Sequence, residues 1–339
     1  MLTHVYCVRF FPPAFPLTAL PSMLLKNLTL YRISDRWPAR PDTLEKKLAD
    51  LPLKPCGAFS MESIGWTAPR DEGEFLYHQG HHWMPALGVE QKLLPGSVIR
   101  QAVEERVAKL AKKQAFPVGR KQKRDLREEV LTELMPRALS KRRITRGWVD
   151  RDNGLLAVDA AGDPKAEQFT ETLRRADDNL GVLRLDTQRS PASAMAEWLS
   201  KGEAPGKFGI DQDLELRAPD ASKASVRYSR HTLEGRDIRD HLGAGKLPVR
   251  LGLTWNDRIS FVLTDTLQVK RITFLDLLKR EDGGEEGDDS GAGDAAEREA
   301  EKFETDFALM TGELSLLLAD LVKALGGEKA REARPAKAA

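Results

Sequence analysis

A short basic segment, Ser140–Trp148 (SKRRITRGW), holds the residue types that are best suited to binding an anion. Four cationic side chains lie within seven residues: Lys141, Arg142, Arg143 and Arg146. No acidic residue occurs between positions 137 and 149. A surface without counter-charges repels itself, and phosphate groups relieve that repulsion as counterions are released. The segment therefore predicts contact with a polyanion, and a solvated surface and a targeting signal are the other interpretations.

Charge is segregated along the chain, although 53 Lys and Arg nearly balance 52 Asp and Glu and leave a formal charge of +1. Residues 92–146 hold 16 basic and 6 acidic residues, whereas residues 281–306 hold 2 basic and 12 acidic residues. This pattern indicates a polyanionic partner and a separate acidic segment. Few aromatic residues lie near the charges, and no RNA-recognition signature or zinc finger occurs. Backbone contact with double-stranded DNA, independent of sequence, is therefore favoured.

Two short motifs contain metal-ligand residue types. In HQGHH (78–82) the histidines have no fourth ligand at a recognisable spacing, so an exposed loop between strands is the favoured interpretation. DRDNG (150–154) resembles part of a calcium loop, but its glycine comes too early and no closing glutamate follows. A tight hairpin with its turn at Asn153 and Gly154 explains this motif better. We therefore expect no metal ion.

The signatures of catalysis are incomplete. GAGK at Gly243–Lys246 lacks the GxxxxGK[ST] frame, and Leu247 stands where a hydroxyl should bind Mg²⁺. The acidic residues do not converge as a metal nuclease requires. Cys7 and Cys56 provide neither a metal-ligand spacing nor a disulfide framework, as expected in a reducing compartment. The residues therefore favour binding over catalysis, and no cofactor is expected; a metal-dependent nuclease and an RNA or anionic-surface binder remain as alternatives.

The first 22 residues are apolar, so a secretory signal has to be considered. They lack a cationic start and contain four prolines, which argues against a signal peptide and against a membrane span. A more regular pattern opens at Met23. Residues 1–22 are therefore interpreted as an extension that we expect to be disordered, and the cytoplasm is the expected location.

From Met23 the sequence predicts an α+β fold. In its first half we expect strands at 24–34, 75–78 and 83–94 and a helix at 42–51. Two basic amphipathic helices follow, joined by the cationic connection AFPVGRKQKR (115–124), and Pro136 ends the second. They predict a helical hairpin that projects from the sheet layer.

The second half predicts more sheet. Helices are expected from Asp163 and from Ser190, the latter ended by Gly202, and strands at 226–233, 247–255, 259–264 and 267–274. A last amphipathic helix should bury one apolar face, made of Phe303, Phe307, Met310, Leu314, Leu317, Leu318 and Leu321. The acidic, glycine-rich stretch at 281–296 is expected to be a disordered loop.

Several motifs occur in order along nearly the whole chain: MLLKNLTLYRIS, PCG, KLLPGSVIRQ, LMPRALS, WVDRDNGLLAVD, AEWL, LGLTWNDRISFV, KRITFLD and FETDFALMTGELSLLLADLVKALGGE. In this combination the chain resembles the bacterial recombination-associated RdgC family, from Met23 to about Glu328. The most specific element is DFALMTGEL.

The resemblance implies a ring-shaped homodimer that encircles duplex DNA without sequence preference and restrains the recombinase RecA by occupying DNA. It implies no catalysis, no membrane association, and a place at the nucleoid. Each subunit would combine mixed or antiparallel sheets with the projecting helical hairpin. Two symmetric contacts would close the ring.

On this basis the chain is divided into regions. The expected regions are a central part (23–91 and 147–190), a basic tip (92–146), a base (191–280 and 297–328), the acidic loop (281–296) and a tail (329–339). The acidic loop is longer than the family needs. It could act as a DNA-mimicking brake or be a solvated insertion, and the second interpretation is favoured.

The resemblance also directs the choice of DNA contacts. From the tip and its junction these are Lys112, Lys113, Lys121, Lys123, Arg124, Lys141, Arg142, Arg143 and Arg146. SVRYSRHTL matches a basic family segment, from which Arg227, Arg230 and His231 are carried over. Strand alternation predicts that Arg227 and His231 share one face, with Tyr228 and Arg230 on the other. Leu139 is the expected dimer contact, where family members can carry an aromatic residue.

Overall fold

The strands of the protein form one large antiparallel sheet. A computed structural model describes residues 24–34, 37, 40–70, 73–114, 116–233, 235–275 and 292–329. Within these ranges, a 12-stranded sheet runs in the order β2-β4-β5-β6-β1-β12-β11-β10-β8-β9, with β3 added to β4 and β7 to β1. All of its strand pairings are antiparallel. The expected α+β class with antiparallel sheet structure is confirmed.

The elements follow the sequence patterns closely in most places. The strands are β1 Asn27–Ile33, β2 Glu62–Thr67, β3 Leu76–Gln79, β4 His82–Lys92, β5 Ser140–Asp150, β6 Leu155–Asp159, β7 Val182–Arg184, β8 Phe208–Arg217, β9 Ser225–Tyr228, β10 Leu247–Trp255, β11 Ile259–Thr264 and β12 Gln268–Phe274. The helices are α1 Pro41–Ala49, α2 Gly96–Gln114, α3 Arg120–Leu134, α4 Asp163–Ala176, α5 Pro191–Lys201, α6 Arg236–Gly243 and α8 Ala292–Ala324, with a short 3-10 turn, η1 Met135–Arg137.

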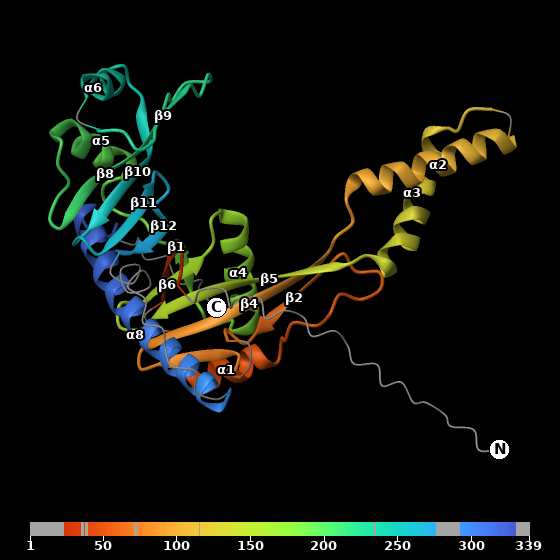
Figure 1. Ribbon diagram of the computed structural model, residues 1–339, viewed down its shortest axis with the longest axis horizontal. Coiled ribbons are helices and arrows are strands. Elements are labelled where there is room, and N and C mark those ends of the chain that lie inside the picture. Colours follow the sequence, from red (N-terminus) through yellow and green to blue (C-terminus); the bar gives the residue numbers. More distant parts are fainter. Residues whose placement is uncertain are drawn as a thin grey trace, which may run out of the picture.

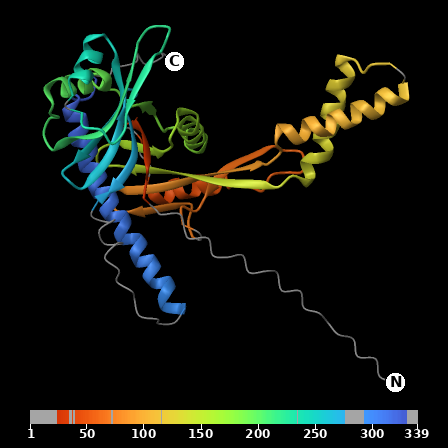
Figure 2. The ribbon, with the colours of Figure 1, turned by 45° about the horizontal axis from the view of Figure 1, so that its top comes forward.

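The molecule is shaped like an arc (Figure 1). The base sheet, defined as β8 to β12, forms one end together with α5, α6 and the last part of α8. The arm, defined as β2, β4 and β5, leads to the tip at the other end, defined as α2, α3 and η1. Figure 2 shows the same separation of tip and base sheet from a second direction. The expected projecting hairpin is confirmed, because α2 and α3 lie between β4 and β5 in the chain.

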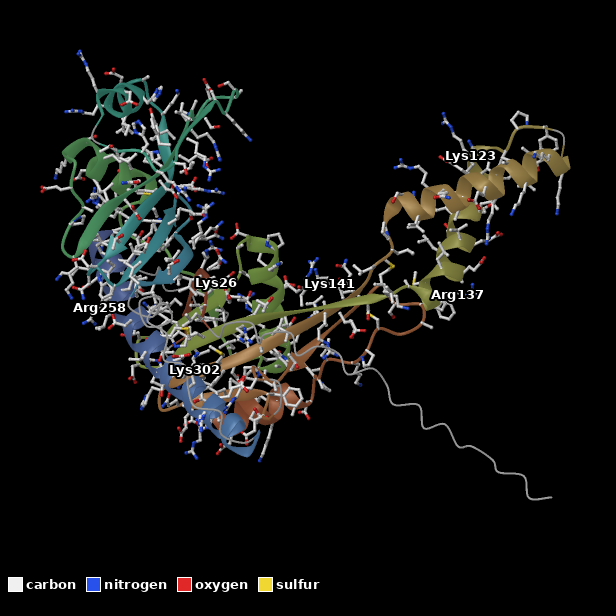
Figure 3. All side chains as sticks on the ribbon, viewed as in Figure 1. Lys26, Lys123, Arg137, Lys141, Arg258 and Lys302 are labelled. Atoms are coloured by element: carbon white, nitrogen blue, oxygen red, sulfur yellow. The ribbon has the colours of Figure 1, made fainter. Side chains whose placement is uncertain are left out.

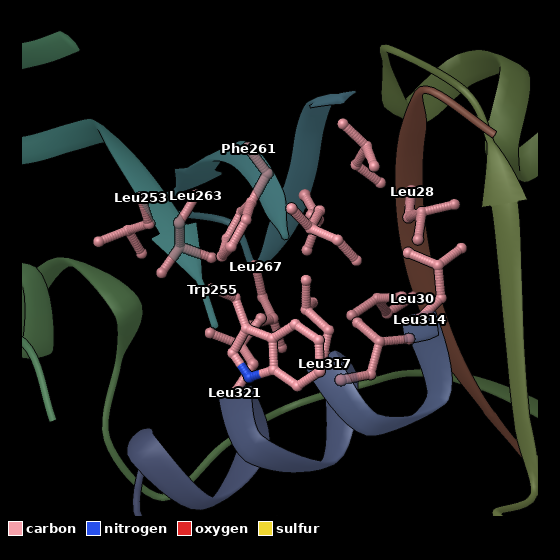
Figure 4. Packing of buried hydrophobic residues seen from close by; sticks show 14 of the residues in the cluster. Leu28, Leu30, Leu253, Trp255, Phe261, Leu263, Leu267, Leu314, Leu317 and Leu321 are labelled. Carbon is pink, nitrogen blue, oxygen red and sulfur yellow. The ribbon is translucent and has the colours of Figure 1, made fainter. Parts of the chain in front are cut away.

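A large apolar core holds α8 against one face of the sheet. One face of α8 is fully buried: Phe307, Met310, Leu314, Leu317, Leu318 and Leu321. Leu28 and Leu30 of β1, Leu253 and Trp255 of β10, and Phe261 of β11 pack in the same cluster (Figure 4). Burying each of these side chains contributes about 1.5–3 kcal/mol. The expected apolar seam of the last helix is thereby confirmed, except that Phe303 is only partly buried.

A second core lies on the opposite face, under α1 and α4. Trp66 of β2 and Phe169 of α4 meet edge to face, with their ring centroids 5.3 Å apart. Gly147 of β5 lies directly beneath that phenylalanine. A Cβ at Gly147 would stand 2.7 Å from Cε1 of Phe169, and closer still to its Cζ. The glycine of the basic segment is therefore required for α4 to approach the sheet.

The predicted helix boundaries are confirmed where local chemistry is strong. Ser190 accepts a hydrogen bond from the backbone N–H of Ser193 at 3.2 Å and begins α5. Gly202 ends the same helix in the left-handed region, with φ at +77°. After α8, Gly326 and Gly327 have φ values of +82° and +93°. Such backbone angles favour glycine because it has no Cβ.

Several expectations were incomplete or wrong. The strands β2, β7 and β8 were not anticipated. The residues 140–146, expected in the tip, form the first part of β5, because β4 extends far enough to pair with all of them. The helix α8 begins at Ala292, inside the range expected for the acidic loop. Residues 1–23, 276–291 and 330–339 lie outside the described residues, so the expectations for the extension, the acidic stretch and the tail stay predictions.

Candidate nucleic-acid interface

The basic segment is divided between the two faces of the arm. Gly147 of β5 lies under α4, and Trp148 is buried in the core with α8. Side chains alternate along a strand, and β5 pairs with β4 without a register shift. Lys141 and Arg143 therefore project from the α4 face, whereas Arg142 and Arg146 project from the opposite face.

Arg142 has a carboxylate partner across the strand. Glu90 of β4 stands opposite it, and its Oε2 lies 3.5 Å from Nη2 of Arg142. The backbone N–H of Cys56 also donates to Glu90, at 3.2 Å, and this bond is the main reason why the pKa of Glu90 is lowered. The expectation that this segment has no counter-charges is wrong at Arg142, because Glu90 pairs with it from a distant part of the chain.

Arg146 is occupied by structural contacts. Its Nε donates to the backbone carbonyl of Pro69 at 3.3 Å. Its positive charge also acts on the carboxyl of Asp159, whose pKa is raised chiefly by burial and lowered in part by Arg146 and by two backbone N–H donors. Half-buried Arg146 thus helps to hold the strands together and is poorly placed to meet an external anion.

Lys141 and Arg143 are different. Both side chains are exposed, and neither side chain makes a hydrogen bond or an ion pair with any residue that the structure describes. Figure 3 shows Lys141 on the inner side of the arc, above β5, whereas Arg258 and Lys302 lie on the outer side. The inner side also carries α4, which rises between the tip and the base sheet. Lys141 and Arg143 therefore face the hollow of the arc.

The tip carries five of the predicted contacts, all of them exposed: Lys112, Lys113, Lys121, Lys123 and Arg124. The first two lie in the last turn of α2, where a cation is favoured by the helix dipole. The other three lie in the first turns of α3, whose first turn has no acidic residue. Cations at this end of a helix are unfavourable, by about 0.3–1 kcal/mol each. Arg124 is the exception, because its Nε lies 4.0 Å from Oε1 of Glu128, one turn further along α3. The positions of Lys121 and Lys123 indicate a role other than stabilising α3.

The base contacts do not follow the strand alternation that was predicted for them, with Arg227 and His231 on one face and Tyr228 and Arg230 on the other. Arg227 stands opposite Glu215 in the pairing of β9 with β8. The strand ends at Tyr228, and Arg230 has φ at +52°, which reverses the chain. His231 consequently packs its ring 5.5 Å from the ring of Tyr228. The predicted separation of Tyr228 from His231 is wrong, because alternation ends where the backbone leaves the extended region.

Three cations in or beside the base sheet were missed by sequence reasoning: Arg184 of β7, Arg250 of β10 and Lys270 of β12. Arg250 lies next to Leu251, and Lys270 lies next to Val269; both of these apolar neighbours are buried in the core with α8. Arg250 and Lys270 therefore project from the α4 face, as Lys141 and Arg143 do. The sequence contains a signal for these two residues, because each is a cation beside the buried apolar residues of a predicted strand and falls at a position that alternation assigns to the opposite face.

Several large apolar side chains are exposed near the junction of the arm and the tip. Leu139, the predicted dimer contact, is 77% exposed. Its carbonyl accepts a hydrogen bond from the N–H of Leu93 at 2.6 Å, and the side chain of Leu93 is itself 49% exposed. Val98 and Phe59 near this junction are also exposed. Clustered large apolar side chains at a surface are typical of protein interfaces.

The histidine motif has structural contacts. Nδ1 of His81 lies 2.7 Å from Oδ1 of Asp152, and Nδ1 of His82 accepts a hydrogen bond from Nε1 of Trp148 at 3.3 Å. The motif forms the turn between β3 and β4. The described part of the chain contains no group of three or more His, Cys, Asp or Glu placed to hold a metal ion. Among the same residues, no helix has the length and apolar character to cross a membrane.

Comparison with known proteins places the chain in a family. Residues 23–328 match the family model described as "Putative exonuclease, RdgC". The "Recombination-associated protein RdgC" of Dechloromonas aromatica is 46% identical over 309 residues, which cover 90% of this chain and 98% of that protein. The protein of the same name from Burkholderia orbicola is 44% identical over 317 residues, which cover 94% of this chain and 100% of that protein. The protein of the same name from Cupriavidus pinatubonensis is 44% identical over 307 residues, which cover 91% of this chain and 99% of that protein. The chain belongs to the RdgC family of recombination-associated proteins.

Proposed function

We propose that the protein binds double-stranded DNA along the inner side of the arc, without reading its sequence. The observation that carries the proposal is that exposed cations without ion pairs, Lys141 and Arg143, project from the same sheet face as Lys270 at the other end of the arc. Between them α4 covers the middle of this face. The cations would contact phosphates, whose spacing is independent of sequence.

We further propose that two subunits close a ring around the duplex. The apolar junction at Leu139 would form one symmetric contact, and the base would form the other. A closed ring that occupies DNA would limit the access of RecA, which agrees with the names of the recombination-associated relatives. DNA binding of this kind would place the protein at the nucleoid, in the cytoplasm.

A salt titration with duplex DNA tests the proposal. Two duplexes of unrelated sequence, labelled for fluorescence anisotropy, should bind with equal affinity, and log K should fall linearly with log salt. A strong preference for one duplex, for structured RNA or for anionic vesicles would overturn it.

Because the family model is described as a putative exonuclease, a second experiment tests for cleavage of DNA. The same duplexes are incubated with the protein and Mg²⁺ or Mn²⁺, and the products are separated on a denaturing gel. The proposed binder leaves both strands intact. Shortened strands that appear only with the metal would instead assign a nuclease.

A further inference from the structure

A pocket of about 260 Å³ opens on the α4 face of the base sheet. We call it the base-wall pocket. Its charged lining consists of Asp213, Glu215, Arg227, Arg250, Lys270 and Arg271. Four different strands supply these side chains: β8, β9, β10 and β12. Cations therefore converge on one point from strands that are distant in sequence.

Each acidic residue of the pocket already has partners. Glu215 lies 2.9 Å from Nη2 of Arg217 and 3.6 Å from Nη1 of Arg250. Asp213 accepts a hydrogen bond from Ser229 Oγ at 2.9 Å and lies 3.6 Å from Nη1 of Arg271. These contacts hold the arginines at the rim. They do not reach Lys270.

Lys270 is partly buried and makes no ion pair with any residue in the described ranges. Burial lowers its pKa, and the nearby charge of Arg250 lowers it further. Arg184 acts in the same direction, whereas Asp163 and Asp265 oppose the shift. Two guanidinium groups, each with a carboxylate partner of its own, thus stand near an ammonium group that makes no ion pair. Positive charge concentrated in this way has a cost in the free protein that a bound anion removes.

Asp163 cannot fill that role, because it is used elsewhere. Its Oδ1 accepts hydrogen bonds from Nη1 of Arg184 at 2.8 Å and from Nε2 of Gln268 at 2.9 Å. These bonds fix the N-terminus of α4 beside the base sheet. Asp265 also acts on the charge of Lys270, but like Asp163 it makes no ion pair with it in the described part of the chain. The place next to Lys270, which opens into the pocket, is therefore available to a ligand from outside the chain.

We propose that the base-wall pocket binds one phosphate group, with Lys270 at its centre and Arg227 and Arg250 beside it. The chemistry is that of a phosphate held by an ammonium and by guanidinium groups, which can donate in pairs. The source of the phosphate is the DNA backbone, a step that rests on the proposed function. The pocket then holds the duplex against the base sheet, and the basic segment of the arm contacts the duplex from another direction.

The test compares four full-length proteins: wild type, Lys270→Gln, Lys270→Arg and Lys302→Gln. The last is a matched loss of one exposed lysine on the outer side of the arc (Figure 3). For Lys270→Gln we expect the slope of log K against log salt to become shallower by about one, and duplex affinity to fall on the order of tenfold. Lys270→Arg should retain most of the affinity, and Lys302→Gln should match wild type. Thermal melting shows that each variant is folded.

A second experiment measures the binding of inorganic pyrophosphate alone by calorimetry, so that anion binding in the pocket is tested without DNA. Wild type should bind it and Lys270→Gln should not. If Lys270→Gln binds pyrophosphate as wild type does, the pocket is no phosphate site. If only pyrophosphate binding responds to Lys270, the pocket serves a free anion and its role in DNA binding is overturned. If wild-type protein binds no duplex at all, the proposed function fails, while pyrophosphate still decides the pocket.

Discussion

Phe169 of α4 occupies the space in which a side chain at Gly147 of β5 would stand. This contact seats α4 on the inner face of the sheet, between the arm and the base sheet. It also sets the faces of β5, because Gly147 and Val149 turn to α4 while Trp148 turns to α8. One glycine thus links the second core to the direction in which Lys141 and Arg143 point.

Gly147→Ala should destabilise the protein by about 1–3 kcal/mol, because an added methyl group overpacks a filled core. The matched control is Gly312→Ala in α8, where an added Cβ meets nothing within 4 Å. That change should be neutral or stabilising by up to about 1 kcal/mol, since alanine favours a helix. Urea unfolding measures both. Equal stability of the two variants would contradict the close contact at Gly147.

The two faces of the basic segment should behave differently in DNA binding. Arg143→Gln should make the salt dependence of log K shallower by about one, because a free cation on the inner side is lost. Arg142→Gln removes the same charge at the adjacent position, on the opposite face and beside Glu90. It should change the slope much less. If the two variants weaken binding equally, only the net charge of the arm matters.

The cations at the start of α3 should show opposite effects on stability and binding. Lys121→Glu places an acidic residue at the positive end of the helix dipole and should stabilise the protein by about 0.3–1 kcal/mol. The same charge reversal at the other helix end, Lys113→Glu in the last turn of α2, should destabilise it by a similar amount. Both should weaken duplex binding. Thermal melting and anisotropy separate the two effects, and unchanged binding by both would remove the tip from the interface.

Lys270→Met should raise the stability of the free protein near neutral pH. The pKa of Lys270 is lowered in the folded protein, so its charged form costs folding free energy at pH values below that lowered pKa. The cost disappears as pH rises through it, and the advantage of the methionine variant should shrink over the same range. The charged groups that act on Lys270 are Arg184, Arg250, Asp163 and Asp265. Urea unfolding across alkaline pH measures the difference; an advantage that grows with pH would contradict the sign.

Leu139→Asp should weaken self-association, because it places a charge in the apolar junction of arm and tip. The control is Leu183→Asp in β7, another exposed leucine, with 59% of its surface accessible against 77% for Leu139. Sedimentation velocity over a range of concentrations measures both variants. Unchanged association of Leu139→Asp would place the contact between subunits elsewhere.

Slow release from circular DNA would support a closed ring. A nicked circle has no ends over which a ring can slide, whereas a short linear duplex has two. After competitor DNA is added, the wild-type protein should remain longer on the circle, and Leu139→Asp should lose that difference. Equal dissociation rates of the wild type from both substrates would contradict encirclement.

Much of the fold could be predicted from the local spacing of apolar residues. The meander β10 to β12 and the buried face of α8 followed from apolar residues at alternating or helical spacing. β8 has the same alternation of apolar and polar residues, but it was missed because two of its polar residues, Asp211 and Asp213, have a low preference for strands. β2 was missed because it contains Gly65, and glycine is rare within strands. Here the lack of a Cβ allows the backbone of Pro52 and Leu53 to pass directly over Gly65. A close approach between distant segments leaves no local signal.

The sequence by itself determined that this chain carries segregated positive charge, which elements bear it, and which family it resembles, because composition, periodicity and motifs are properties of neighbouring residues. Only the tertiary structure decided which cations are available. Glu90 comes to Arg142 from 52 positions away, and Lys270 meets Arg250 only because β10, β11 and β12 are neighbours in the sheet. Whether a charge is neutralised or left for a phosphate depends on distances of a few ångströms between residues remote in sequence.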